Sequence, residues 1–374
     1  MATTLTYEQM LAEIVRQDQL KVDLLADTRK MSATVEDGKV LVNVDAASGL
    51  QTFALNDHCL GQISTDLEIP KRYFDRMRVD APDLLTVNVN HWLNNEPKKR
   101  MLRGFRPEGG QQYGTGRAFV SSGYKRLDYI EIARNIFPVF KDIPGLTFHQ
   151  SQITDTKLYL RAVLPGLKAD LKPRPNGHVP GTYIDTDGLK LGDEIWAGIE
   201  IRNSEVGASQ LEINPFVYRL VCMNGMIVRS YGTQRRHVGK RITEEQFYRA
   251  DTLEADDKAF WLKARDDAAA VLSEVRFNEI ATKLAESVYG DKVVAPVAAT
   301  QELQQRYSLT DAERDAVLRN LTEAGDFSQW GMANAMTAAA KTVESFDRQA
   351  ELEGLGWDVA TLTTKDWAAV AVAA

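Results

Sequence analysis

The spacing of apolar residues divides the chain into three regions, and in the first, residues 1–95, helical and extended patterns alternate. The predicted elements are a helix over Tyr7–Lys21, a strand over Lys39–Asp45 and further helices between Leu55 and Trp92. Asn56 or Asp57 is a suitable N-cap for the first of these later helices, and Pro70 suits the start of the next. We therefore expect a mixed α/β region at the N-terminus.

Residues 96–241 contain the short apolar runs that are typical of strands. The predicted strands are Met101–Phe105, Ala118–Ser121, Leu146–Ile153, Lys157–Leu164, Glu194–Arg202 and Gln210–Val228. A helix is expected at Asp128–Phe140. The Asn203–Gly207 segment predicts a turn between two core strands, and the segment Lys168–Lys190, rich in proline, glycine and aspartate, predicts an exposed loop.

Residues 242–374 have helical periodicity nearly throughout. Thr243 and Gln246 have the spacing of a capping box, and the pattern continues with breaks to about Glu286. Later helices are expected at Asp311–Ala324 and Trp330–Leu352. The predicted fold class is α+β, a β-rich central domain with N-terminal helices and a largely helical C-terminal region. The expected divisions are 1–95, 96–241 and 242–374.

The composition is that of an ordinary globular chain: 374 residues, 44% hydrophobic and 26% charged, with a formal net charge of −7. Apolar runs are short and interrupted by charges, and the N-terminus lacks a basic flank followed by an apolar stretch. Neither a membrane span nor a secretory signal is therefore expected. Cys59 and Cys222 are too few for a disulfide framework or a zinc ribbon. We expect a protein of the bacterial host cytoplasm that uses no cofactor.

A first basic cluster lies between residues 95 and 126, where eight Lys and Arg residues accompany two Glu residues. The members expected to contact nucleic acid are Lys98, Lys99, Arg100, Arg103, Lys125 and Arg126, with Tyr124 as a stacking candidate. Cations along a groove with interleaved aromatic rings are a common means of holding a single strand. The same residues also suit an edge strand protected from aggregation, or a site for a small anionic ligand.

A second basic cluster follows Met223, and no acidic residue occurs from there to Arg241. Its members are Arg229, Tyr231, Arg235, Arg236, His237, Lys240 and Arg241, with Tyr231 as the stacking candidate. Gly239 permits close approach of a phosphate, and the helix predicted from Thr243 would add partial positive charge at its N-terminus. Alternatively, these arginines bind carboxylates of the C-terminal helices, such as Glu244, and Tyr231 packs on the core.

No pattern in the chain predicts a catalytic centre. The five histidines are dispersed without the HxH or HExxH spacing of metal sites, and neither the GxxxxGK[ST] phosphate loop nor the GxSxG nucleophile elbow occurs. Cys222 lies in an apolar run and is expected to pack in the core. One catalytic alternative stays open, a metal-dependent nuclease whose carboxylates would be Asp185, Asp187, Asp193, Glu194 and Glu200.

The order of several motifs resembles the phage- and plasmid-encoded family known as domain of unknown function 932. The matching segments are Ile69–Tyr73, Trp92-Leu93, Arg117–Leu127, Asn203–Gly207, Leu220–Met226, Arg236–Gly239 and Trp330–Thr337. The most specific part is the Asn-Ser-x-x-Gly element followed by Cys-x-Asn-Gly. The resemblance implies an origin in a mobile genetic element, and it supplies neither an activity nor catalytic residues.

The leading hypothesis is a single-stranded DNA-binding protein of a phage or plasmid, which promotes strand annealing in recombination without ATP. It follows from two basic clusters in a β-rich region, and from a fold-level analogy with phage single-strand annealing proteins that assemble as rings or filaments. The expected partners are single-stranded DNA and further copies of the chain. The alternatives are the nuclease, and a protein-binding module that acts against host defence through its acidic C-terminal helices.

Overall fold

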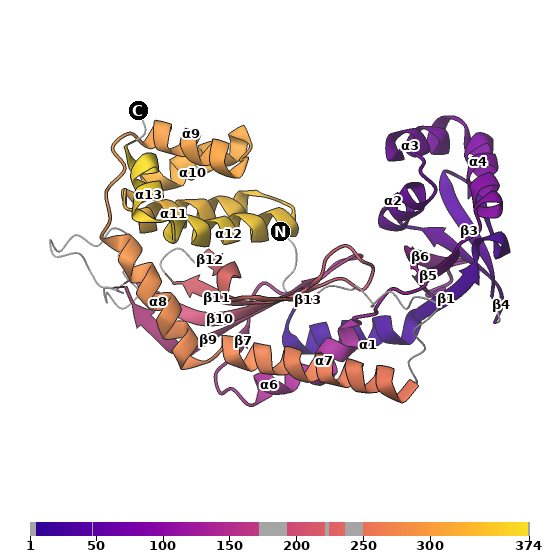
Figure 1. Ribbon diagram of the computed structural model, residues 1–374, viewed down its shortest axis with the longest axis horizontal. Helices are drawn as coiled ribbons and strands as arrows, with labels where there is room; N and C mark the ends of the chain where they lie inside the picture. Colours follow the sequence, from indigo (N-terminus) through magenta and orange to yellow (C-terminus); the bar gives the residue numbers. More distant parts are fainter. Residues whose placement is uncertain (1–4, 47, 172–192, 221–223, 236–249, 373–374) are drawn as a thin grey trace.

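The computed structural model describes residues 5–46, 48–171, 193–220, 224–235 and 250–372 of the chain. Two β-sheets organise it, a six-stranded sheet in an N-terminal lobe and a seven-stranded central sheet. In Figure 1 the N-terminal lobe and a group of C-terminal helices lie at opposite ends of the central sheet. The chain is α+β, with sheets in its N-terminal and central parts and helices in its C-terminal part, as the sequence predicts.

The N-terminal lobe is built from residues 21–121. Its elements are β1 (Lys21–Asp27), η1 (Thr28–Lys30), β2 (Met31–Glu36), β3 (Lys39–Ala46), β4 (Gly49–Leu55), α2 (Asp57–Asp66), α3 (Lys71–Asp80), α4 (Pro82–Asn95), β5 (Lys99–Phe105) and β6 (Gly114–Ser121). The strand order is β1-β5-β6-β4-β3-β2, and only β4 and β6 pair in parallel among these neighbours. Phe53, Phe74 and Phe119 lie in its core.

The six-stranded sheet curls because its two edge strands follow one another in sequence. β1 and β2 lie at opposite edges, yet only the three-residue turn η1 separates them. Helix α4 forms hydrogen bonds with the backbone of the edge strand β2. Asn90 Oδ1 accepts from the Ala33 N–H at 2.7 Å, and Asn90 Nδ2 donates to the Ala33 carbonyl at 2.9 Å. An edge bonded in this way resists pairing with another chain.

The central sheet takes its strands from residues 147–235. They are β7 (Thr147–Phe148), β8 (Gln152–Ile153), β9 (Leu158–Asp170), β10 (Glu194–Asn203), β11 (Leu211–Arg219), β12 (Asn224–Ile227) and β13 (Thr233–Arg235). The path runs β12-β11-β10-β9-β7, with β13 paired to β11 and β8 to β9. The helices beneath it are α1 (Tyr7–Leu20), α5 (Tyr129–Asn135), α6 (Phe137–Lys141) and α7 (Ala250–Val271). Thus α1 precedes the N-terminal lobe in sequence but packs with the central sheet.

Alternation along β10 gives the central sheet one apolar face. Ile195, Ala197, Ile199 and Ile201 belong to this face and are at most 3% exposed. The helices beneath the sheet bury one half of the face, and α8 (Glu274–Val288) helps to bury the other half. Full burial of an isoleucine side chain contributes about 1.5–3 kcal/mol, so this face is a main source of stability.

The opposite face of the same strands is charged. Glu200 of β10 lies between Arg161 of β9 and Asn214 of β11. The helix α12 (Phe346–Ala360) adds Glu353, whose carboxylate accepts from Arg161 at 2.5 and 3.1 Å, while Glu200 accepts from it at 3.2 Å. Arg161 is 1% exposed, so two carboxylates share one guanidinium within the interface between sheet and helix.

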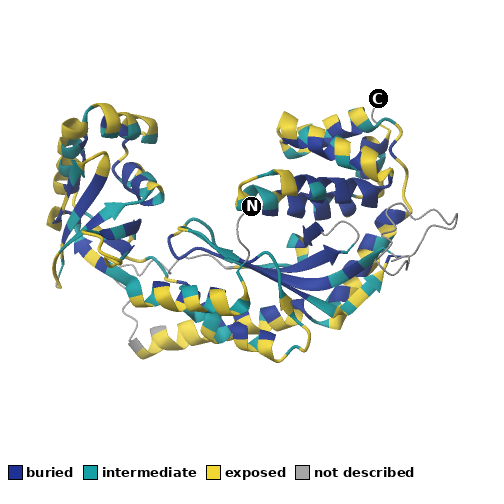
Figure 2. Ribbon diagram, turned by 180° about the vertical axis from the view of Figure 1, so that it is seen from behind, coloured by how far each residue is buried: buried dark blue, intermediate teal, exposed yellow. Residues whose placement is uncertain are grey.

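The C-terminal helices form the largest core. Beyond α8 they are α9 (Pro296–Tyr307), α10 (Asp311–Ala324), α11 (Gln329–Ala339), α12 and α13 (Thr364–Ala371), with the turn η3 (Ala340–Thr342) after α11. Figure 2 shows α11 and α12 as mostly buried, because they lie between the sheet and the outer helices. Trp330, Trp357 and Trp367 are each at most 2% exposed within this core.

Several predicted elements are confirmed. The helix predicted at Asp311–Ala324 is α10, and Asn56 caps α2 by accepting from the Cys59 N–H at 2.9 Å. The predicted Asn203–Gly207 turn lies between β10 and β11. The helix predicted over Trp330–Leu352 is instead two helices, because the chain turns after η3 and Ser345 caps α12.

The boundary predicted between residues 95 and 96 does not separate the two sheets. β5 and β6, assigned by the sequence to the central domain, pair with β1 and β4 of the N-terminal lobe. Pairing between strands about 80 residues apart leaves no local pattern, so the spacing of apolar residues could not reveal it. The helix start predicted at Thr243 lies outside the described residues, as does most of the predicted loop Lys168–Lys190, although β9 extends to Asp170.

Candidate nucleic-acid interface

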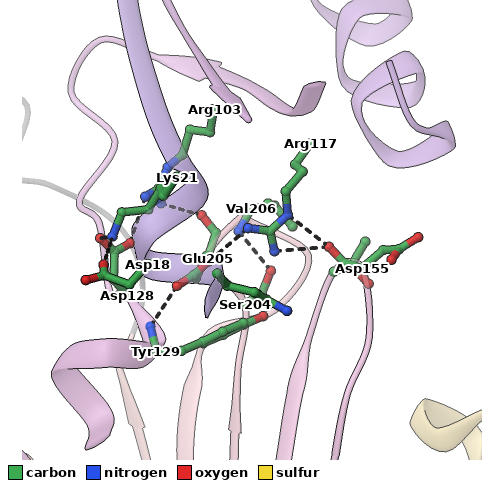
Figure 3. Close-up of polar contacts among 12 residues, drawn as sticks. Asp18, Lys21, Arg103, Arg117, Asp128, Tyr129, Asp155, Ser204, Glu205 and Val206 are labelled. Carbon is green, nitrogen blue, oxygen red and sulfur yellow. Dashed lines mark hydrogen bonds and ion pairs between the residues drawn. The ribbon is translucent and has the colours of Figure 1, made fainter. Parts of the chain in front are cut away.

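The turn between β10 and β11 extends from the central sheet into the N-terminal lobe, and residues 203–207 are called the connecting loop below (Figure 3). Asn203 anchors its start by donating from Nδ2 to the Leu127 carbonyl at 2.6 Å. The Ser204 hydroxyl accepts from the N–H groups of Val206 and Ala208 at 3.2 and 2.9 Å. Gly207 has a φ of +81°, a left-handed conformation that carries a Cβ penalty for other residues. These bonds and this backbone give the loop a defined shape.

Glu205 is the centre of the contacts that the connecting loop makes. Its Oε2 accepts from Arg117 Nη1 at 3.0 Å, and its Oε1 accepts from the Tyr129 N–H at 2.8 Å. Its backbone carbonyl accepts from Arg103 Nη1 at 2.6 Å. Arg117 also donates to the Asp155 carbonyl at 3.2 Å, and its guanidinium lies 4.2 Å from the ring centroid of Phe105. One glutamate thus binds two arginines of the N-terminal lobe.

Arg103 is an internal ion-pair partner and is not exposed on a surface. It is 3% exposed, and it pairs with Asp23 at 2.8 Å and with Asp128 at 2.7 Å. Burial alone would lower its pKa, but the two carboxylates outweigh burial and raise it. Lys21 binds Asp128 from the other side at 2.7 Å. The expectation that Arg103 contacts nucleic acid is therefore corrected. Its partners Asp23 and Asp128 lie 80 and 25 residues away in the sequence, so no local sequence pattern could indicate them.

The Val206 carbonyl joins the connecting loop to α2. His58 Nε2 lies 2.9 Å from this oxygen, and Gln62 Nε2 donates to it at 2.8 Å. Gln62 Oε1 in turn accepts from the Phe119 N–H of β6 at 2.7 Å. The loop is therefore bonded to both the helix and the strand that it approaches.

A cleft of about 800 Å³, called the Lys98 cleft, opens beside α2. Its lining cations are Lys71, Lys98 and Arg100, and its carboxylates are Asp57, Asp66 and Glu68. Asp66 neutralises Arg100 at 2.6 Å, whereas Lys98 Nζ donates to the neutral Asp66 carbonyl at 3.0 Å. Lys99 is exposed, and side-chain alternation places it on the opposite face from Lys98 and Arg100. Lys98 and Arg100 thus line the cleft, and Lys99 does not.

A second cleft of about 230 Å³, called the Arg117 cleft, lies at the start of β6. Arg16, Arg106 and Arg117 line it together with Phe105 and Glu108. Arg16 pairs with Glu108 at 2.5 Å across the cleft. Arg106 is exposed, so its guanidinium faces solvent.

The segment Thr115–Ser121 of β6, a span of about 20 Å, contributes residues to both clefts. Thr115 and Arg117 line the Arg117 cleft, and Phe119 and Ser121 line the Lys98 cleft. A β-bulge at Arg117 interrupts the side-chain alternation, because Arg117 is the extra residue between the pairs Arg103–Ala118 and Gly104–Gly116. Thr115 and Arg117 therefore lie on one face of β6, and Phe119 and Ser121 lie on the face of the core. The connecting loop is bonded to lining residues of both clefts, to Arg117 through Glu205 and to His58 and Gln62 through Val206.

The last residues of the first basic cluster lie beside the connecting loop. Tyr124 donates to the Glu205 carbonyl at 3.2 Å, and burial raises its pKa. Lys125 pairs with Asp257 of α7 at 3.0 Å and lies 4.9 Å from the Phe260 ring centroid. Arg126 is more exposed, 3.4 Å from Asp23. Tyr124 and Lys125 therefore contribute to contacts between elements, and Arg126 retains an exposed side chain.

Arg229 and Tyr231 of the second basic cluster hold the central sheet to the C-terminal helices. Arg229 donates to the Ala350 carbonyl of α12 at 3.2 Å. The Tyr231 ring packs with Trp357, and the cationic groups of Arg276 and Lys283 lie 4.6 and 5.0 Å from its centroid. Arg235 ends β13, while Arg236, His237, Lys240 and Arg241 lie outside the described residues. The alternative interpretation, in which Tyr231 packs on the core, fits this geometry.

The carboxylates of the nuclease alternative are dispersed where the structure describes them. Asp193 binds Arg219 at 2.5 Å and the Trp330 indole at 2.7 Å, and Glu194 binds Lys168 at 2.9 Å. Glu200 is fully buried beside Arg161. Asp185 and Asp187 lie outside the described residues. Within the described part of the chain, no group of three or more His, Cys, Asp or Glu residues is placed to hold a metal ion.

The residues that sequence reasoning missed are Arg16, His58, Gln62, Lys71 and Glu205, and it assigned Arg106 and Arg117 no role of their own. Lys71 belongs to the Ile69–Tyr73 motif, which was a signal of family resemblance only.

Comparison with protein-family models, with curated proteins and with solved structures finds no match. The resemblance to the domain of unknown function 932 family stays a prediction. Among the described helices, none has both the length and the apolar character that crossing a bilayer requires.

Proposed function

We propose that the protein binds single-stranded nucleic acid between the Lys98 and Arg117 clefts, along a path that passes the connecting loop. The observation that carries this proposal is that cations from four separate segments line two clefts, and that the connecting loop is bonded to lining residues of both. The cations are Arg16, Lys71, Lys98, Arg100, Arg106 and Arg117. A path of about 20 Å is long enough for a few nucleotides.

The electrostatics favour contact with the backbone phosphates. Lys71 pairs with Asp75 at 2.5 Å, but both side chains are more than a third exposed, and a surface pair of this kind contributes little. A phosphate can therefore replace Asp75 at small cost. The carboxylates of the Lys98 cleft oppose binding, so the affinity should be modest and strongly dependent on salt.

Binding of this kind requires neither ATP nor a metal. In line with the sequence analysis, we place it in the recombination of a phage or plasmid, where a protein that neutralises two single strands promotes their annealing in the bacterial cytoplasm. Assembly of several copies would extend the short path of one chain into a longer one. Phosphate neutralisation with exposed bases is sufficient for this activity, and no catalytic residue is assigned.

A fluorescence anisotropy titration with a labelled oligothymidine tests the proposal. Lys98→Gln should weaken binding about fivefold, the loss of about 1 kcal/mol for one charge-assisted contact, and should lower the salt dependence. Lys99→Gln is the matched control, since it removes the same charge from the neighbouring position on the other face. Absence of salt-sensitive binding would remove the proposal. Capture of a host protein without oligonucleotide binding would favour the protein-binding alternative.

A further inference from the structure

We infer that the Glu205 carboxylate occupies a phosphate site on Arg117, and that the connecting loop is an internal competitor of the nucleic acid. The inference rests on the proposed function and adds a mode of regulation to it. In the structure the loop is bonded to lining residues of both clefts, to Arg117 of the Arg117 cleft and to His58 and Gln62 of the Lys98 cleft. A nucleic acid that extends from one cleft to the other and contacts Arg117 has to replace Glu205 there.

Arg117 has the surroundings of an anion-binding arginine. Its guanidinium lies against the Phe105 ring, which fixes its plane, and the Asp155 carbonyl accepts from its Nε and Nη2 at 3.4 and 3.2 Å. A planar guanidinium held in this way recognises carboxylate and phosphate oxygens alike. Arg117 is only 4% exposed, yet it lines the Arg117 cleft beside the exposed Arg106. A phosphate that enters this cleft therefore reaches a preformed arginine.

Residues 203–206 of the connecting loop are buried, and polar bonds hold them to the N-terminal lobe. These bonds are those of the Glu205 carboxylate to Arg117, of the Glu205 carbonyl to Arg103 and of the Val206 carbonyl to α2. Each bond can be exchanged for one to water or to a phosphate, whereas an apolar core contact has no such replacement. The cost of releasing the loop lowers the apparent affinity of the wild-type protein.

The decisive variant is Glu205→Gln, which keeps the size of the side chain and an acceptor for the Tyr129 N–H but removes the charge from Arg117. The anisotropy titration should give an affinity about tenfold above that of the wild type, the equivalent of one hydrogen bond to a charged group. The double variant Glu205→Gln/Arg117→Gln should lose this gain. Glu353→Gln is the matched control, because Glu353 is also a buried partner of an arginine, Arg161, in the other interface. It should leave oligonucleotide binding unchanged.

A second measurement needs no variant. Hydrogen exchange of the Val206 and Ala208 amides, both bonded to Ser204, should become faster when the wild-type protein is saturated with oligothymidine. Equal or slower exchange in the complex contradicts displacement of the loop, as does an unchanged affinity of a folded Glu205→Gln protein. If neither protein binds the oligonucleotide, the proposed function itself fails. If the wild type binds through Lys98 and Glu205→Gln adds nothing, only the role of Glu205 fails.

Discussion

At the scale of single residues, the contact between the central sheet and α12 depends on Arg161. This guanidinium is buried between Glu200 and Glu353, so its removal would leave two carboxylates without their shared cation. Burial raises the pKa of Glu353 despite the nearby arginine, which indicates that the carboxylate is costly in its charged form. A buried ion pair of this kind fixes how two elements meet and adds little net stability.

Arg161→Met should therefore lower the free energy of unfolding by about 3–5 kcal/mol, as expected when one member of a buried ionic group is removed. Glu353→Gln should change it far less, because the amide oxygen still accepts from Arg161 and one buried charge disappears. Urea unfolding followed by circular dichroism measures both. Similar losses in the two variants would contradict this account of the cluster.

The sequence could indicate that charges gather between residues 98 and 126, but it could not indicate which of them are exposed. Arg103 and Arg117 look like Lys98 and Arg100 in sequence, yet they are buried against Asp23, Asp128 and Glu205. Each of these partners lies at least 25 residues from its arginine. A cation that pairs with a carboxylate distant in the sequence and a cation that is exposed to bind a ligand have the same local sequence pattern.

At the scale of elements, local signals were reliable wherever local physics decides the outcome. The cap of α2 at Asn56 and the limits of α10 follow from hydrogen bonds within a few residues. The strand β5 was also predicted, but its place in the N-terminal sheet was not, since its pairing with β1 is decided by the whole fold. The limits of these two helices were therefore predictable, whereas the break within the predicted Trp330–Leu352 helix and the assignment of strands to sheets were not.

The junction of α10 and α12 gives a prediction about pH. Glu313 closes the capping box of α10 with Thr310 and also accepts from Arg348 of α12 at 2.7 and 2.8 Å. The Arg348 guanidinium is the main cause that lowers the Glu313 pKa to about 2, against an ordinary value of 4.5. A lowered pKa means that Glu313 stabilises the fold above its unfolded pKa and that this stability is lost as the pH falls towards 2.

Glu313→Gln should accordingly cost on the order of 2 kcal/mol at neutral pH and much less near pH 2. Thermal unfolding of both proteins across this range measures the difference. The control is Glu323→Gln, an exposed position on the same helix, which should show no such pH dependence. A cost that stays constant from pH 7 to pH 2 would show that the carboxylate charge is not the source.

At the scale of the whole molecule, the connecting loop is one of the contacts that join the central sheet to the N-terminal lobe, together with Asp128 and Asp155. The sequence marked the Asn203–Gly207 element as its most specific motif without indicating a role. The structure gives it one, since Asn203, Ser204, Glu205 and Gly207 each have a geometric reason to be present. The proposed binding path and its control by Glu205 both lie at this junction.

Photochemical cross-linking tests most directly whether single-stranded nucleic acid lies between the Lys98 and Arg117 clefts. An oligothymidine with halogenated bases would be cross-linked to the wild-type protein at low salt, and the modified peptides would be identified by mass spectrometry. The account predicts cross-links in residues 56–73 and 98–121, which disappear as salt is raised. Cross-links confined to residues 250–372 would contradict it. So would the absence of cross-links in residues 56–73 and 98–121 under conditions where anisotropy detects binding.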